Sequence, residues 1–175
     1  NGEFTVNIAL VRNGKPVIGV IHAPVTRTLY YASLESGAYK VNGLKVLEGQ
    51  NGGATPVEVM RDALKLPIHP LPVDYTLVAS RSHLSKEVNE RINLAKAKYT
   101  NVNIVNTGSS IKFCLVAEGL AHEYPRFGAT MEWDTAAGQC IVEESGGKVI
   151  DPGNGEPIRY NRKDLKNGDF LVLCN

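Results

Sequence analysis

Apolar and polar residues alternate along the first part of the chain with the period of two that is typical of β-strands. The turn sequences RNGKP, APVTR and LESG separate four such runs. We therefore predict an antiparallel meander with strands at Phe4–Val11, Pro16–His22, Thr28–Ser33 and Gly37–Val41. Because the alternation is already present at Glu3, we expect the chain to begin inside a sheet and to be a fragment.

A second region starts after the glycine-rich sequence EGQNGG. Thr55 as cap and Pro56 at the first helical position predict a short helix that ends before Pro67. We assign residues 1–49 to the remainder of an antiparallel-sheet half, 50–72 to a connector, and 73–175 to a C-terminal α/β half.

In the C-terminal half, strand-like runs alternate with helical patterns. Predicted strands are YTLVAS, VNIVNT, LAHEY, KVID and DFLVLC, and predicted helices are SKEVNERINLAKAKY, SSIKFCLVAEG and DTAAGQCIVEESGG. This order predicts a mixed α/β fold with a mostly parallel sheet flanked by helices. Ligands of such sheets gather at the carboxyl ends of the strands.

Charge and composition exclude some partners. Nineteen basic and eighteen acidic residues give a net charge of +1 without a basic run, so we expect no nucleic acid polymer as partner. No apolar stretch is long enough for a transmembrane segment, and no signal peptide is visible. Three cysteines without CxxC spacing favour buried thiols and a cytoplasmic location, with peripheral attachment to the inner membrane face left open. The oligomeric state is left open too.

Three strand-to-helix junctions carry polar groups: SRSH, NTGSSIK and MEWDTAAG. In the second, Gly108 frees the backbone, Ser109 and Ser110 present hydroxyls and amides to a phosphate or sugar, and Lys112 adds a positive charge. The alternative is that a serine only caps the helix and that Lys112 is solvated.

In the third junction, Asp134 occupies the expected N-cap of a helix, where capping alone would explain it. The small residues of TAAG allow this helix start to approach a backbone or a ligand closely, and Trp133 either walls the site or belongs to the core. Arg126 after a strand could fork onto a phosphate or be solvated. His83 in SRSH is the weakest candidate.

Together, SRSH, GSSIKFCLVAEGLAHEYPRFG and EWDTAAGQCIVEESGGKVID resemble 3′(2′),5′-bisphosphate nucleotidases of the CysQ type, within the inositol monophosphatase-like superfamily. The resemblance implies a layered αβαβα sugar phosphatase fold, here without its N-terminal helices and first strands. It implies a Mg²⁺-dependent phosphatase that removes the 3′-phosphate of the small-molecule nucleotide adenosine 3′,5′-bisphosphate, giving AMP, in sulfur assimilation. The near alternatives are inositol monophosphatase and sugar bisphosphatase activity.

The resemblance also implies roles for single residues. Asp134 would bind metal and meet the substrate, while Ser109, Lys112 and Arg126 would contact the ribose or the remaining phosphate and His83 would lie near the nucleotide. The family's GEE and DPxDGT motifs would precede Asn1. Because one carboxylate is a poor Mg²⁺ site, we expect this chain alone to lack catalytic residues and activity. A non-catalytic nucleotide-binding module is the alternative from another class.

Overall fold

The computed structural model describes residues 2–44, 55–80 and 85–175. Its first sheet is antiparallel, with strand order β1-β2-β3-β4-β5. The strands are β1 (Val6–Arg12), β2 (Lys15–Ala23), β3 (Thr28–Ser33), β4 (Gly37–Val41) and β5 (Leu64–Lys65). The predicted meander is thus confirmed. Asn13 and Gly14 both have positive φ in the tight turn between β1 and β2, as the NG sequence predicts.

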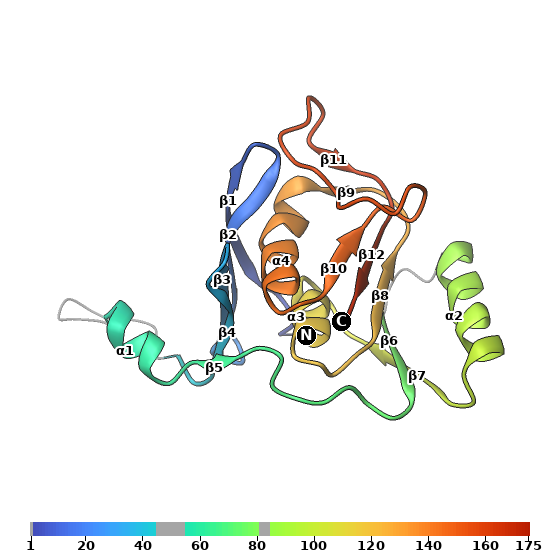
Figure 1. Cartoon of the computed structure of the whole chain (residues 1–175), viewed down its shortest axis with the longest axis horizontal. Coiled ribbons are helices and arrows are strands. Elements are labelled where there is room, and N and C mark those ends of the chain that lie inside the picture. The colour runs from blue at the N-terminus through green and yellow to red at the C-terminus, as the bar shows by residue number, and fades with distance from the viewer. Residues whose placement is uncertain (1, 45–54, 81–84) are drawn as a thin grey trace.

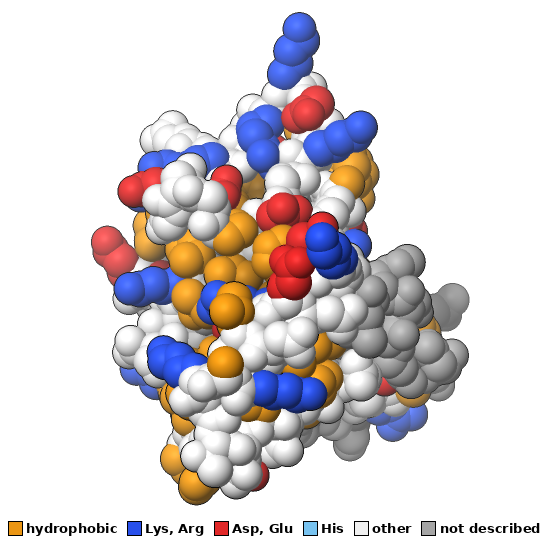
Figure 2. Space-filling model, turned by 90° about the vertical axis from the view of Figure 1, so that its right-hand side faces the viewer, with side chains coloured by type: hydrophobic (Ala, Val, Ile, Leu, Met, Phe, Trp, Pro, Cys, Tyr) orange, Lys and Arg blue, Asp and Glu red, His pale blue; other side chains and the backbone are white. Residues whose placement is uncertain are grey.

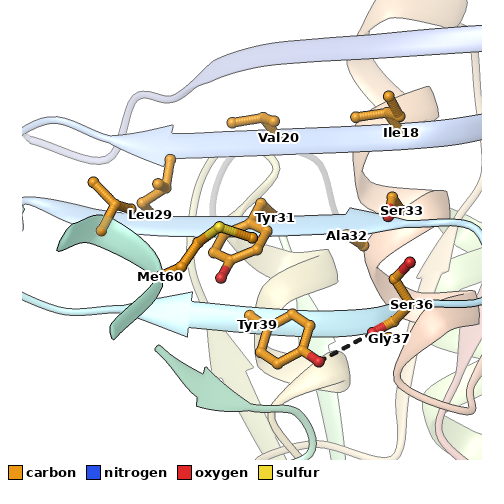
Figure 3. Close-up of a pocket in the computed structure, with 11 residues that line it drawn as sticks. Ile18, Val20, Leu29, Tyr31, Ala32, Ser33, Ser36, Gly37, Tyr39 and Met60 are labelled. Atoms are coloured by element: carbon orange, nitrogen blue, oxygen red, sulfur yellow. Dashed lines mark hydrogen bonds between the residues drawn. The ribbon is translucent and has the colours of Figure 1, made fainter. Parts of the chain in front are cut away.

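Helix α1 (Pro56–Arg61) lies beside the outer face of this sheet. Thr55 and Glu58 form a capping box at its start, which agrees with the predicted cap. Between α1 and the sheet runs a groove of about 690 Å³, lined mainly by apolar side chains. Figure 3 shows Ile18 and Val20 of β2, Leu29 and Tyr31 of β3, and Met60 of α1 around it.

The second sheet is mixed, with strand order β10-β12-β8-β6-β7. Its strands are β6 (Tyr75–Ala79), β7 (Val102–Asn106), β8 (Glu123–Arg126), β10 (Lys148–Ile150) and β12 (Phe170–Leu173). β6 is parallel to β7 and β8, whereas β12 is antiparallel to both β8 and β10. The predicted parallel arrangement fails at β12, because residues 151–169 connect it to β10 without the crossover helix that usually joins parallel neighbours.

A third, two-stranded sheet was not predicted. It pairs β9 (Thr130–Met131) with β11 (Lys166–Asn167) in antiparallel orientation. Strands of two residues carry no readable alternation, so the sequence pattern gives no signal for them.

Two helices lie between the two sheets, and another covers the outer face of the mixed sheet (Figure 1). Helices α3 (Ile111–Ala117) and α4 (Glu132–Glu144) lie between the two sheets, and α2 (Lys86–Lys98) lies on the other side of the mixed sheet. The helix predicted at SKEVNERINLAKAKY is confirmed as α2, with Val88, Ile92 and Ala95 buried on one face. The order of layers is therefore antiparallel sheet, helices, mixed sheet, helix. The division of the chain into residues 1–49, 50–72 and 73–175 stays a prediction.

Small residues let α4 pack against both neighbours. A Cβ on Gly19 of β2 would lie 2.5 Å from the carbonyl oxygen of Ala137, and a Cβ on Gly138 would lie 2.5 Å from Cγ of Phe113 in α3. The TAAG sequence thus serves the close approach of backbone to backbone, one of its two expected uses. This packing fixes the starts of α3 and α4 relative to each other.

The two faces of β1 differ in burial. Asn7, Ala9 and Val11 are partly buried on the face that packs towards α4, while Val6, Ile8 and Leu10 are 49%, 63% and 54% exposed on the other. The alternation was read correctly, but it places the larger apolar side chains on the exposed face.

Candidate functional site

A small polar pocket of about 180 Å³ lies where the first residues of α3 and α4 approach the end of β8. Its lining includes five predicted site residues, from three segments of the chain: Ser109, Ser110, Lys112, Arg126 and Asp134. Asn7, Phe113, Tyr124, Thr130, Thr135 and Phe170 complete the lining. Gly108 adjoins the pocket through the next residue, Ser109, and His83 lies outside the described residues.

Asp134 is not the N-cap of its helix, contrary to prediction. α4 begins at Glu132 with Met131 as N-cap, so Asp134 is the third helical residue. It still satisfies a free amide of the helix start, because the N–H of Met131 donates to Asp134 Oδ2 over 2.9 Å. Oδ1 has no hydrogen bond to any described residue, which leaves it available to a ligand of the pocket.

The start of α3 is shaped by two serines. Ser110 is the N-cap but makes no capping hydrogen bond, which rejects the alternative that it is an ordinary cap. Its hydroxyl instead lies 2.7 Å from both Asn7 Oδ1 and Thr5 Oγ1, and Thr5 also bonds to the hydroxyl of Ser109. Ser109 adopts a positive φ of 56°, an uncommon conformation for a residue other than glycine.

Lys112 is buried, with only 6% of its surface exposed, which rejects the alternative that it is solvated. Its ammonium donates to the carbonyl of Ser109 over 2.7 Å and lies 5.2 Å from the ring centre of Tyr124. Burial, together with the positive charge of Arg126, lowers the pKa of Lys112 from 10.5 to about 8, while Glu3 acts in the opposite direction. A bound anion would relieve this unfavourable environment.

Arg126 is the last residue of β8 and supplies the second positive charge of the pocket. Its Nε is buried and makes no hydrogen bond to the described residues. Buried donors of this kind normally have a partner. An anion between Arg126 and Lys112 would provide one and would reduce their repulsion.

Residues in and just before β1 also shape the site, which was not predicted. Thr5 and Asn7 bond to the two serines, and the carboxylate of Glu3 accepts the N–H of Gly108 over 2.7 Å. Glu3, Thr5 and Asn7 alternate along the start of the chain, from just before the first predicted strand into it, which was a usable signal that one face of that strand points at the site. Thr130 and Thr135 were missed as well, although both flank MEWD.

Trp133 fits neither of its two predicted roles. Its side chain is 59% exposed and is not part of the pocket lining. The predicted burial of cysteines is confirmed for Cys114 and Cys140, whose thiol pKa values are raised by burial. Cys174 is partly exposed, and all three are free.

The described residues do not form a metal site by themselves. No group of three or more His, Cys, Asp or Glu side chains within them is arranged to hold an ion. Asp134 offers one free carboxylate oxygen, and Mg²⁺ in protein sites combines carboxylates with water and substrate phosphate. The donor set thus fits one ligand of such a site and does not complete it.

Figure 2 shows acidic and basic side chains interspersed on the side that it presents, with apolar side chains between them. None of the helices in the part of the chain that the structure describes is long and apolar enough to cross a bilayer.

The fold and the pocket define a member of a phosphatase family. The model of the inositol monophosphatase family matches residues 1–173, and the chain belongs to this family. Family members are generally metal-dependent phosphatases.

Among curated proteins, the chain is similar to the 3′(2′),5′-bisphosphate nucleotidases CysQ of Salmonella typhimurium and Escherichia coli K12, with 42% and 41% identity over 98% of its length. The crystal structure of CysQ from Bacteroides thetaiotaomicron superimposes with a TM-score of 0.91 at 47% identity, covering 99% of this chain and 63% of that one. The resemblance inferred from the motifs and the fold that it implied are thereby confirmed.

More distant structures share the fold. Staphylococcal SaIMPase-II with bound inositol monophosphate gives a TM-score of 0.66 at 20% identity, covering 98% of this chain and 57% of that one. The chain spans 61% of the length of the two curated relatives named above.

Proposed function

We propose that this chain provides the nucleotide-binding side of a 3′(2′),5′-bisphosphate nucleotidase. The reaction is hydrolysis of the 3′-phosphate of adenosine 3′,5′-bisphosphate to AMP and phosphate, in cytoplasmic sulfur assimilation. The observation that carries the proposal is a pocket that holds two serines, Asp134, Lys112 with a pKa lowered by burial, and Arg126 with an Nε that has no hydrogen bond to the described residues. The names of the CysQ relatives support the nucleotide as substrate.

Each residue has a defined task in this proposal. The Arg126 guanidinium and the Lys112 ammonium hold the phosphate that is not cleaved, since charged hydrogen bonds to phosphate are strong and directional. Ser109 and Ser110 contact the ribose or the same phosphate, beside Gly108. Their hydroxyl oxygens can accept a ribose O–H, because the Ser110 hydroxyl already donates to Asn7 Oδ1. The proposed place of His83 near the nucleotide lies outside the described residues.

Asp134 directs its free oxygen towards the reacting phosphate group. There it would be one ligand of Mg²⁺, the ion that would supply charge neutralisation and an activated water when bound. The remaining ligands are not among the described residues, so we assign no catalytic step to this chain and expect it to be inactive alone.

Phosphate release from adenosine 3′,5′-bisphosphate with Mg²⁺ tests the activity. We would compare the 175-residue chain with the protein encoded by the whole reading frame that contains Asn1. The expected result is release by the latter and none by the former. Release only from inositol phosphates or sugar bisphosphates would reject the nucleotide as substrate and favour the near alternatives.

A second candidate is a nucleotide-binding module without catalysis. It is favoured by one observation, that the described residues hold no group of acidic or metal-binding side chains large enough for a metal ion. If the whole reading frame releases no phosphate from any of these substrates while the 175-residue chain binds AMP in calorimetry, this second function replaces the first.

A further inference from the structure

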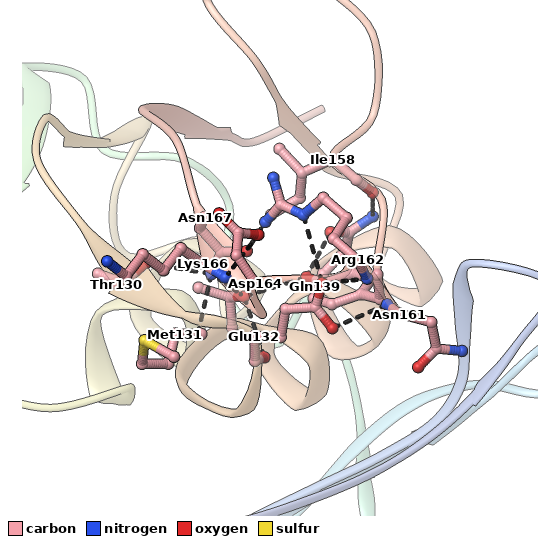
Figure 4. Close-up of polar contacts among 12 residues, drawn as sticks. Thr130, Met131, Glu132, Gln139, Ile158, Asn161, Arg162, Asp164, Lys166 and Asn167 are labelled. Atoms are coloured by element: carbon pink, nitrogen blue, oxygen red, sulfur yellow. Dashed lines mark hydrogen bonds and ion pairs between the residues drawn. The ribbon is translucent and has the colours of Figure 1, made fainter.

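The start of α4 is held by the segment that runs from β10 to β12, which the sequence patterns did not connect with the site. This segment contains Arg162 and ends in β11 with Lys166 and Asn167, and it pairs with β9 directly ahead of α4. The N–H of Glu132 donates to the carbonyl of Leu165 over 2.9 Å. Figure 4 shows Arg162 and Asn167 of the segment beside Glu132 in the first turn of the helix.

Glu132 and Arg162 hold the segment against the start of α4 by hydrogen bonds. The buried carboxylate of Glu132 accepts the backbone N–H groups of Asn161 and Arg162 over 2.8 and 3.0 Å, and Nε of Arg162 over 3.3 Å. Nη2 of Arg162 then donates to Oδ1 of Asn167 over 2.6 Å. Because arginine has no acceptor, this contact fixes which end of the Asn167 amide carries the oxygen.

The NH₂ group of Asn167 must therefore face α4. It lies 2.9 Å from the carbonyl oxygen of Met131, 2.8 Å from Oγ1 of Thr135 and 3.1 Å from Oγ1 of Thr130. Asn167 is only 5% exposed, so water cannot replace these bonds at low cost. Its amide has one favourable orientation.

A continuous hydrogen-bonded path leads from this amide to the pocket. The Asn167 amide donates to the carbonyl oxygen of Met131, and the backbone N–H of Met131 donates to Asp134 Oδ2 over 2.9 Å. We infer that Asn167 is a positioning residue that sets the orientation of the Asp134 carboxylate through Met131. The expected effect of Asn167 on turnover rests on the proposed function, whereas the coupling between Asn167 and Asp134 through Met131 does not.

Hydrogen exchange tests the coupling in the 175-residue chain, without any activity. In Asn167→Ala, the Met131 amide loses its fixed geometry towards Asp134, and we expect its protection to fall at least tenfold more than that of amides in the middle of α4. Asn167→Asp, which keeps the size but replaces the donor by an acceptor, is expected to give the same selective loss. Equal loss along the whole helix in both variants would overturn the inference, because it would indicate general destabilisation.

Kinetics of the active protein from the whole reading frame supply the second measurement. Both variants are expected to lower kcat at least tenfold with KM changed less than threefold, because Asn167 does not line the pocket. Unchanged kcat would overturn the positioning role. Tyr30→Phe is the matched control, since it removes a buried 2.6 Å hydrogen bond to Glu118 at the other end of α3 and should leave kcat unchanged.

Phosphate release by the wild-type protein and hydrogen exchange of the Met131 amide test different claims. If the wild-type protein releases no phosphate from the nucleotide, the proposed function is wrong, and the exchange of the Met131 amide still decides whether Asn167 orients Asp134. If the wild-type protein is active and the exchange effect is absent, only the positioning inference is rejected.

Discussion

The starts of α3 and α4 face the same pocket and are built differently. At α3, Ser109 and Ser110 exchange hydrogen bonds with Asn7 of β1 and with Thr5 just before it, and the charged side chain of Lys112 is buried beside them. At α4, a buried network from Glu132 to Asn167 surrounds the helix start, and Asp134 is its only carboxylate in the pocket lining. The arrangement at α3 sets the positive charge that faces the pocket, and the arrangement at α4 sets the orientation of the Asp134 carboxylate.

This difference separates two kinds of mutational effect. Changes at the α3 side and at Arg126 should alter the binding of an anion and its pH dependence. Changes at the α4 side should alter turnover while binding is retained. The predictions below test this separation, from the largest expected effect to the smallest.

Asp134→Asn should lower phosphate release by the active protein about 100-fold or more, the size seen when one group that stabilises transition-state charge is removed. Stability should change by less than about 1 kcal/mol, because an asparagine oxygen can still accept the N–H of Met131. Kinetics and chemical denaturation measure both quantities. Asp169→Asn is the control, since Asp169 also accepts a backbone N–H, that of Gly128, outside the pocket. Near-normal turnover of Asp134→Asn would return this residue to a purely structural role.

Arg126→Met should weaken AMP binding to the 175-residue chain by about 1.5–3 kcal/mol, the range for hydrogen bonds to charged groups. The protein should keep or gain stability, because the buried Nε has no partner among the described residues. Calorimetry gives the affinity and thermal unfolding the stability. Unchanged affinity would mean that Arg126 does not touch the ligand.

Gly138→Ala should destabilise the chain by about 1–3 kcal/mol, the usual cost of overpacking a core. The new Cβ would lie 2.5 Å from Cγ of Phe113 and would push α3 and α4 apart. Gly168→Ala is the matched control, because a Cβ there would meet nothing within 4 Å. If urea unfolding shows equal stability for both variants, the two helix starts are not fixed by this contact.

The smallest effect concerns pH. Because the pKa of Lys112 is lowered from 10.5 to about 8, the folded protein loses this proton before the unfolded chain does. The free energy of unfolding of the wild type, relative to Lys112→Met, should therefore rise from pH 8 to about 10.5. AMP affinity should fall over the same pH range as the ammonium is lost. A flat difference in stability would contradict the buried, perturbed lysine.

The regular elements were predictable because their patterns are local. β3 and β4 were predicted to the residue, and the capping box of α1 and the buried face of α2 follow from single positions. The GSSIK, YPRFG and EWDTAAG sequences led to five residues that the structure brings together in one pocket.

What could not be predicted depends on contacts between distant segments. The N-cap of α4 is Met131, three residues earlier than expected, because β9 and β11 pair directly ahead of the helix and Glu132 accepts the backbone N–H groups of residues 161–162. The burial of Lys112 depends on the ring of Tyr124, which another strand supplies. Alternation in β1 shows two faces, but it does not tell which one meets α4.

The most direct test of the account is an NMR titration of the isotopically labelled 175-residue chain with AMP. The account predicts saturable shifts at the backbone amides of Ser109, Ser110, Lys112 and Arg126, with smaller shifts at the groove beside α1 or none there. Loss of these shifts in Arg126→Met would confirm that the ligand is held as an anion. Absence of shifts at the α3 start, or shifts confined to the groove lined by Val20 and Met60, would contradict the proposed nucleotide site.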